Sequence, residues 1–215
     1  MLEPEVMDSA TYAREYDEMD HREVNARFVA DLLTLEADLA LVLDVGTGTA
    51  LLPIELCQKE PSCRLVAIDL AAHMLSLARA NIERAALAGV IAAERRDAKA
   101  SGFADATFTA VISNSIVHHI PDPSLALAEM TRVLAPGGTL FVRDLARPTG
   151  DSNVSRLVAT YAGRATPHQR ALFDASLRAS LTLQEVQALA ARAGIDPAVV
   201  TMTSDRHWTL AWKKP

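Results

Sequence analysis

Hydrophobic and polar positions follow two different periods along the chain, and the change between them marks the elements we expect. Before residue 39, apolar residues recur every three or four positions, which predicts helices. Asp8 can cap a first helix that runs through Met19. The apolar positions of a second helix share one face: Val24, Phe28, Leu32 and Leu35. Residues 39–43 are then continuously apolar, which is typical of a strand buried on both faces.

Short apolar runs and amphipathic stretches alternate through the middle of the chain. The apolar runs predict strands at residues 39–43, 64–68, 90–94, 108–113 and 139–144. The amphipathic stretches predict helices at residues 50–59, 71–88 and 124–134. We expect Pro136, Gly137 and Gly138 to stop the last of these helices before the fifth strand begins. Strict alternation implies right-handed crossovers and a parallel sheet that is covered by helices.

The pattern loosens in the last third of the chain. Residues 148–180 are polar and are expected to form pieces of helix that cap a site. Thr182 should open a further helix with Glu185 in a capping box, and Gly194 should end it. Two strand-like runs, at residues 199–203 and 207–212, predict a terminal hairpin. The predicted fold class is therefore α/β: a Rossmann-like, doubly wound, mostly parallel seven-stranded sheet with one antiparallel strand in the C-terminal hairpin.

Composition narrows the function classes. The chain has 21 basic and 27 acidic residues, a formal net charge of −6, which argues against unaided binding to nucleic acid. No run of about 18 apolar residues occurs, so we expect no membrane span. The acidic N-terminus lacks the profile of a secretory signal, and we expect a cytoplasmic protein. Cys57 and Cys63 are then expected to be free core thiols rather than a disulfide.

A glycine-containing turn follows the first predicted strand and opens a helix. Gly46 and Gly48 let the backbone turn tightly and approach a ligand, although a plain strand-to-helix turn has the same pattern. A dinucleotide fingerprint needs a small residue where Leu51 stands, and the Gly-Lys-Ser/Thr of a P-loop is missing. The turn therefore favours a ligand that has no diphosphate.

Carboxylates stand at the tips of the next two predicted strands. Asp69 can accept hydrogen bonds from a ribose diol, or it can cap the helix that begins at Ala71. Asp97 can accept a hydrogen bond from an adenine amino group, or it can be a solvated loop carboxylate. In the first case the ring would lie between apolar neighbours such as Leu70 and Ala98. The sequence therefore predicts a nucleoside site at the strand tips.

Taken in order, these motifs resemble the class I S-adenosylmethionine-dependent methyltransferases over about residues 38–145. The chain is most similar to their small-molecule type, that of the ubiquinone/menaquinone-biosynthesis methyltransferases. The resemblance is carried by Asp44, Gly46, Gly48, Asp69, Asp97, Ser113, Asn114, Ser115, Pro136, Gly137 and Gly138. The hairpin that ends at Trp212 is similar to that family's last two strands. One departure is Ala50, where the family often has a third glycine.

The resemblance implies how S-adenosylmethionine would bind. Gly46 and Gly48 would pass beneath its methionine part, and Asp44 would face the amino group directly or through water. The other positions would be Asp69 at the ribose, Leu70 and Met74 beside the adenine, Asp97 and Ala98 at its amine, Asn114 near the methyl, and Tyr12 and Tyr16 over the cofactor. For the two tyrosines, a role as packed surface aromatics is equally open.

Methyl transfer from a sulfonium is an in-line displacement, for which the protein aligns the acceptor and excludes water. A general base is required only if the acceptor must lose a proton. His118 is the first candidate for that base and His119 the second. A purely structural role for the two rings is equally open. A metal site is disfavoured, because no nearby Cys or Glu completes a set of ligands.

The resemblance to the small-molecule type implies a small-molecule acceptor. The loop after residue 114 lacks the Asn/Asp-Pro-Pro-Tyr/Phe motif of amino-methylating nucleic-acid enzymes, and this absence and the negative charge argue against a DNA acceptor. Arginines between residues 143 and 178 could attract an anionic acceptor, or they could be solvated helix residues. Two other functions stay open. One is an NAD-dependent oxidoreductase, against which Leu51 and the missing Tyr-x-x-x-Lys pair count. The other is a non-catalytic family member that binds cofactor without turnover.

We expect a single domain over residues 1–215, because this length suits one α/β domain. Its parts would be an N-terminal helical cap (1–38), a cofactor-binding core (39–145), a substrate cap (146–181), and a final helix with the β-hairpin (182–215). The sequence gives no indication of the oligomeric state or of the acceptor's identity.

Overall fold

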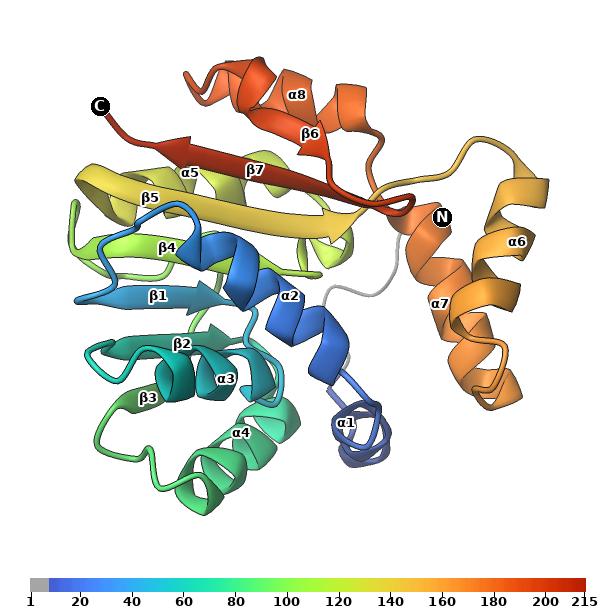
Figure 1. Ribbon diagram of the computed structural model, residues 1–215, viewed down its shortest axis with the longest axis horizontal. Coiled ribbons are helices and arrows are strands. Elements are labelled where there is room, and N and C mark those ends of the chain that lie inside the picture. The colour runs from blue at the N-terminus through green and yellow to red at the C-terminus, as the bar shows by residue number, and fades with distance from the viewer. Residues whose placement is uncertain (1–7) are drawn as a thin grey trace.

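The computed structural model describes residues 8–215; the beginning of the expected N-terminal cap, residues 1–7, lies outside the described residues. Within that described part, seven strands form one sheet in the order β3-β2-β1-β4-β5-β7-β6 (Figure 1). The strands are β1 (Val42–Val45), β2 (Leu65–Asp69), β3 (Ile91–Arg95), β4 (Phe108–Asn114), β5 (Leu134–Leu145), β6 (Val200–Met202) and β7 (His207–Lys213). β7 runs antiparallel to both β5 and β6, and the remaining neighbours are parallel. The predicted fold class is confirmed.

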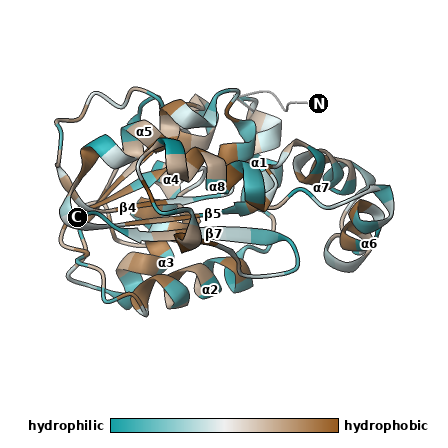
Figure 2. Cartoon of the chain, turned by 90° about the horizontal axis from the view of Figure 1, so that it is seen from above, coloured by the Kyte–Doolittle hydropathy of each residue, from teal (hydrophilic) through white to brown (hydrophobic). Residues whose placement is uncertain are grey.

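Helices cover both faces of this sheet. They are α1 (Ala10–Asp17), α2 (Arg22–Leu33), α3 (Leu51–Lys59), α4 (Ala72–Arg84), α5 (Pro123–Val133), α6 (Asp151–Tyr161), α7 (Pro167–Ala179) and α8 (Leu183–Arg192), with 3-10 turns η1 (Val117–His119) and η2 (Pro197–Val199). Apolar side chains of α2, α3 and α4 pack with one face of the strands, and those of α5 and α8 pack with the other. Figure 2 shows α2 and α3 on one side of the sheet and α5 and α8 on the opposite side.

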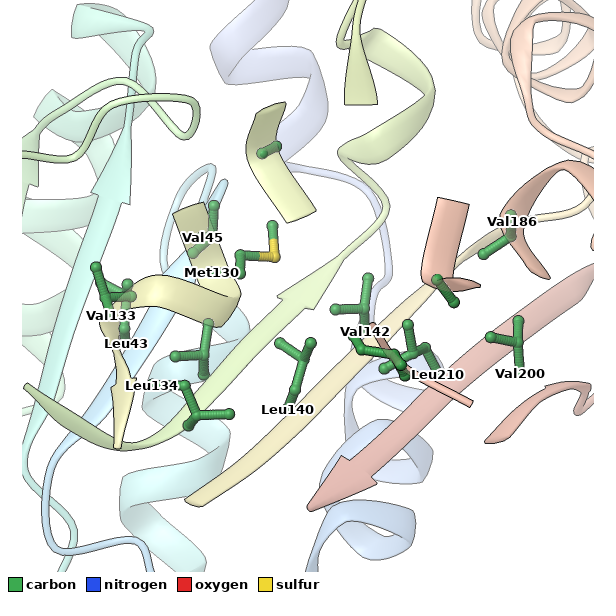
Figure 3. Packing of buried hydrophobic residues seen from close by; sticks show 14 of the residues in the cluster. Leu43, Val45, Met130, Val133, Leu134, Leu140, Val142, Val186, Val200 and Leu210 are labelled. Atoms are coloured by element: carbon green, nitrogen blue, oxygen red, sulfur yellow. The ribbon is translucent and has the colours of Figure 1, made fainter. Parts of the chain in front are cut away.

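The continuous apolar runs form central strands because their side chains are buried on both faces. In β1, Val42 belongs to the cluster beneath α2 and α3, whereas Leu43 and Val45 belong to the cluster beneath α5 and α8. Met130 and Val133 of α5 pack into this second cluster (Figure 3). Each such fully buried side chain contributes about 1.5–3 kcal/mol relative to an exposed position. This burial fixes the strand register and therefore the positions of the strand tips.

Two expected boundaries are wrong at the ends of helices. Ser9, not Asp8, caps α1, since its hydroxyl accepts a hydrogen bond from the Tyr12 backbone N–H at 3.1 Å. The Asp8 carboxylate instead accepts hydrogen bonds from the backbone and ring of His73 on α4, at 2.9 and 2.8 Å. The long helix expected at residues 71–88 ends at Arg84, and Ala86 adopts the left-handed conformation that helices often use to stop.

The expected start of the fifth strand is also wrong. β5 begins at Leu134 and includes Pro136, Gly137 and Gly138, where a loop was expected. Leu134 pairs with Phe108 of β4, and the backbone N–H of Gly137 donates a hydrogen bond to Lys214 at 2.8 Å. The Pro-Gly-Gly sequence ends α5 as predicted, but neighbouring backbone groups keep the following residues within the sheet.

The helical pair α6 and α7 projects from the edge at which β5 ends (Figure 1). Leu157 of α6 and Leu177 of α7 pack with Leu145 at the end of β5. The turn between β6 and β7 secures the outer helix as well. Arg206 stacks on the Tyr161 ring at 3.3 Å, and the Tyr161 hydroxyl donates a hydrogen bond to Asp205 at 3.0 Å. These contacts hold α6 against the turn between β6 and β7.

Candidate functional site

The candidate site lies where the strand order reverses direction. β1 pairs with β2 on one side and with β4 on the other, so the chain crosses to opposite faces of the sheet from this point. Ligands of open α/β sheets bind outside the carboxyl ends of the strands at such a position. These carboxyl ends point toward α1, which lies beside them (Figure 1).

The glycine-containing turn at the tip of β1 is held by the neighbouring strand. The backbone N–H groups of Gly46 and Thr47 both donate to the carbonyl of Ile68 at 2.9 Å. Gly46 and Gly48 have φ of +76° and +55°, and a Cβ on Gly46 would lie 2.5 Å from Cγ2 of Ile116. The residue type at these positions is therefore dictated by the backbone and by a close neighbour.

Ala50, which stands where the resemblance suggests a third glycine, also has a left-handed backbone, with φ of +62°. A side chain in this region costs roughly 1–2 kcal/mol more than glycine. The Ala50 methyl is fully buried among the residues of α2 and α3. Alanine in place of glycine therefore raises the conformational energy of the turn, and its methyl group lies in the core.

Asp69 does not cap α4, whose N-cap is Ala71, but its carboxylate binds two backbone groups beside that helix. One carboxylate oxygen accepts a hydrogen bond from the Ala71 backbone at the start of α4, at 2.9 Å, and the other accepts from the Gly48 backbone at 2.8 Å. A carboxylate has about four lone-pair positions, so two remain for a ligand. Burial raises the pKa of Asp69 above its ordinary value, and the backbone hydrogen bonds oppose that rise. Asp69 thus joins the glycine turn to the start of α4.

A first hollow of about 400 Å³ lies beside Asp69 and includes the second predicted carboxylate, Asp97, as well as His119. Leu70 and Ala98 are part of its wall, as expected for the two sides of a flat ring. The Asp97 carboxylate accepts hydrogen bonds from the backbone and the ammonium of Lys99, both at 2.9 Å. Slight burial would raise the pKa of Asp97, but these contacts with Lys99 hold it below its ordinary value.

A second hollow of about 350 Å³ lies on the other side of the turn, where α2 and α1 approach the strand tips. Within the described residues, Oδ2 of Asp44 and Oδ1 of Asn114 are buried and accept no hydrogen bond. Burial raises the pKa of Asp44 to about 7. Leaving a buried acceptor unpaired costs about 1–3 kcal/mol, so a ligand that donates hydrogen bonds would be favoured here.

A third hollow, of about 600 Å³, connects the first two. It shares Asp69, Leu70 and His119 with the first hollow, and Gly46, Tyr16 and Asn114 with the second. Met74 and Gly48 also line it. The predicted cofactor residues therefore surround one continuous cleft: Asp44, Gly46, Gly48, Asp69, Leu70, Met74, Asp97, Ala98, Asn114 and Tyr16. The structure thus brings these residues together, as a common binding site requires.

The two histidines occupy different places. His118 is buried, and its Nδ1 lies 2.6 Å from a carboxylate oxygen of Asp144. Burial opposes ionisation of Asp144, but the His118 ring holds the pKa of that carboxyl below its ordinary value. His119 lines the first and third hollows. Among the two candidates for a base, the geometry therefore favours His119, the second choice of the sequence.

Sequence reasoning missed several residues of the site. Ile116 packs over Gly46 and lines two of the hollows. The buried Asn81 of α4 donates hydrogen bonds to Asp17 of α1 at 2.8 Å and to the Thr49 carbonyl at 3.0 Å. Asn81 thereby ties the covering helix to the glycine turn. Its only sequence signal is a polar residue on the apolar face of an amphipathic helix.

Three further expectations concern metals, membranes and the arginines. Residues 8–215 contain no group of three or more His, Cys, Asp or Glu side chains that could hold a metal ion. In the same range, no helix has the length and apolar character that crossing a membrane requires. Of the six arginines between residues 143 and 178, four form ion pairs with carboxylates. The pairs are Arg143 with Asp31, Arg147 with Glu185, Arg156 with Asp205, and Arg178 with Asp151 and Asp174.

The chain is similar to methyltransferases in sequence and in fold. Residues 43–142 match the family model described as a methyltransferase domain. The chain is 35% identical over 108 residues to the ubiquinone/menaquinone biosynthesis C-methyltransferase UbiE of Geobacter sulfurreducens, a match that covers 50% of this chain and 42% of that protein. It is 34% identical over 173 residues to malonyl-[acyl-carrier protein] O-methyltransferase of the same organism, covering 80% of this chain and 62% of the relative.

The chain thus spans about half the length of the first curated relatives it matches. A crystal structure of a SAM-dependent methyltransferase from Aquifex aeolicus superposes with a TM-score of 0.68 at 17% identity, over 94% of this chain and 97% of that one. At this identity the likeness concerns the fold alone. The family-model match over residues 43–142 and the identity to UbiE confirm the resemblance to class I S-adenosylmethionine-dependent methyltransferases.

Proposed function

We propose that this protein transfers a methyl group from S-adenosylmethionine to a small-molecule acceptor, as a cytoplasmic enzyme. The observation that carries the proposal is the continuous cleft in which the unpaired, buried acceptors of Asp44 and Asn114 stand at one end and Asp69 and Asp97 at the other. This arrangement offers hydrogen-bond acceptors to both ends of an amino-acid-linked nucleoside, and it occurs within a methyltransferase domain.

Each part of the cofactor has residues of suitable chemistry. The α-ammonium would donate hydrogen bonds to Asp44 and Asn114, which satisfies acceptors that are otherwise buried and unpaired. The ribose hydroxyls would donate to the free lone pairs of Asp69. The adenine would lie against Leu70 and its neighbours, within the first hollow. The chemistry of the donor and acceptor groups therefore fits S-adenosylmethionine, whose bound form supplies an electrophilic methyl on a sulfonium.

The chain's own contribution is alignment and exclusion of water. Tyr16 lies over the glycine turn, so that a Cβ on Gly48 would be 3.4 Å from its ring, and α1 thereby covers the cleft. A nucleophile held about 3 Å from the methyl in such a covered site reacts in line without a metal. If the acceptor must lose a proton, His119 is the base we propose, because its ring lines the cleft.

The acceptor class follows from charge and from the relatives' names. Two of the curated relatives are named as a ubiquinone/menaquinone biosynthesis C-methyltransferase and a malonyl-[acyl-carrier protein] O-methyltransferase, which supports a small acyl or aromatic acceptor. The net charge of −6 makes a nucleic-acid acceptor unfavourable. The arginine–carboxylate pairs lower the positive charge available to an anionic acceptor.

Calorimetry with S-adenosylmethionine, S-adenosylhomocysteine and NADH tests the proposal. We expect 1:1 binding of the first two and none of NADH. Binding of NADH alone would revive the oxidoreductase hypothesis and overturn the proposal. Release of S-adenosylhomocysteine in the presence of quinols, phenols and acyl thioesters then measures turnover. Cofactor binding without release in a broad panel of this kind would instead indicate a non-catalytic protein.

A further inference from the structure

The short η1 turn is held by one buried carboxylate from another strand. Asp144, near the end of β5, uses one oxygen to accept hydrogen bonds from the His118 ring and from the Leu145 backbone, both at 2.6 Å. Its other oxygen accepts from the His118 backbone at 3.2 Å. The side chains of Asp144 and His118 are only 1% and 4% exposed. Three N–H donors thus offset the cost of burying this carboxylate.

The clamped ring in turn supports the ring of the next residue. The centroids of His118 and His119 lie 4.2 Å apart, with 37° between the ring planes. His119 lines both the hollow beside Asp69 and the hollow that leads toward Asn114. A tilted ring at this distance restricts the rotation of its neighbour, and the buried hydrogen bonds fix the orientation of the His118 ring.

We propose that Asp144 and His118 form a positioning pair that sets the His119 ring against the bound nucleoside; this inference rests on the proposed function. Asp144 acts through His118, and neither side chain lines the three hollows of the cleft. This role explains why a histidine occupies the buried position 118: its ring N–H donates to Asp144, and its ring face lies against His119. His119 is the member of the set that contacts the ligand.

Asp144→Asn is a sharp perturbation because both Asp144 oxygens face N–H groups. An asparagine has a single oxygen, so its NH2 group must point at the N–H of either His118 or Leu145, whichever way the amide turns. The substitution keeps the size and shape of the side chain and removes at least one of the hydrogen bonds that hold His118 and Leu145. We expect the affinity for S-adenosylhomocysteine, measured by calorimetry, to fall about fivefold, within the range of couplings between contacting residues.

A double-mutant cycle separates positioning from a general structural effect. His119→Ala should weaken binding by itself, and adding Asp144→Asn to it should change the affinity less than twofold, because the ring to be positioned is gone. Asp31→Asn is the matched control, since it removes a carboxylate partner of Arg143, the residue before Asp144. It should leave the affinity within twofold in both backgrounds.

A second variant keeps the test open if Asp144→Asn does not fold. His118→Asn retains a side-chain N–H for Asp144 but removes the ring face beside His119, and it should show the same dependence on His119. NMR of the imidazole nitrogens adds a binding-independent measurement: Asp144→Asn should shift the His119 signals, and Asp31→Asn should not. If Asp144→Asn weakens binding by the same factor with and without His119, the positioning role is wrong, and the proposed function is unaffected. Absence of nucleoside binding by the unaltered protein would overturn the proposed function and the inference with it.

Discussion

Asp69→Asn is the perturbation that most clearly tests whether Asp69 contacts the cofactor. The two Asp69 oxygens each accept a backbone N–H, from Gly48 at 2.8 Å and from Ala71 at 2.9 Å. The asparagine NH2 group must face one of these donors, so one internal hydrogen bond is lost together with one acceptor for the ribose. A hydrogen bond to a charged group contributes about 1.5–3 kcal/mol. We therefore expect the dissociation constant of S-adenosylhomocysteine to rise about 30-fold, which is about 2 kcal/mol.

The measurement is calorimetric titration at pH 7.5, with urea unfolding of each variant to show that the protein is folded. Asp38→Asn is the matched control. Asp38 also accepts a hydrogen bond from the backbone two residues later, that of Ala40 at 2.9 Å, but it precedes β1 at the opposite edge of the sheet. The affinity of the Asp38→Asn protein for S-adenosylhomocysteine should be unchanged. A folded Asp69→Asn protein that binds within twofold of the unaltered protein would refute the assignment of Asp69 to the ribose.

Three other predictions concern separate parts of the structure. Because burial raises the pKa of Asp44 to about 7, its contribution to stability is present below pH 4 and is lost as the pH rises through 7. Asp44→Asn should therefore gain stability over the unaltered protein between pH 5 and 8 in urea unfolding, and a pH-independent difference would contradict this. Gly46→Ala should cost about 2–4 kcal/mol, from its left-handed backbone and the contact with Ile116; a loss below about 1 kcal/mol counts against that origin. Leu177→Ala should cost about 2–5 kcal/mol within the α6–α7 pair, so hydrogen exchange should speed up there and stay slow in β1 and β4; uniform acceleration would show that the pair does not open separately.

The strand tips could be predicted from the sequence because their chemistry is local. A continuous apolar run marks each central strand, and the residue that follows the run lies at the carboxyl edge whatever the exact register. Asp69 and Asp97 follow two such runs, and Gly46 and Gly48 follow a third. Parallel pairing then brings these tips together, which the structure realises as one cleft.

The contacts that could not be predicted depend on distant partners. Asp8 and Ser9 are equally suited to cap a helix, and the choice is made by His73, which lies 65 positions away from Asp8. The different surroundings of His118 and His119 depend on one turn of 3-10 helix and on Asp144 of another strand. Sequence patterns give the period of an element, and they do not give the side chain that meets it from elsewhere in the fold.

A crystal structure of the protein with bound S-adenosylhomocysteine would show directly whether the cleft at the strand tips is the cofactor site. We expect the ligand to span all three hollows, with its ammonium at Asp44, its ribose hydroxyls on Asp69 and its adenine against Leu70. Density for the nucleoside in any other place, with the cleft at the tips of β1 and β2 filled by solvent, would contradict it.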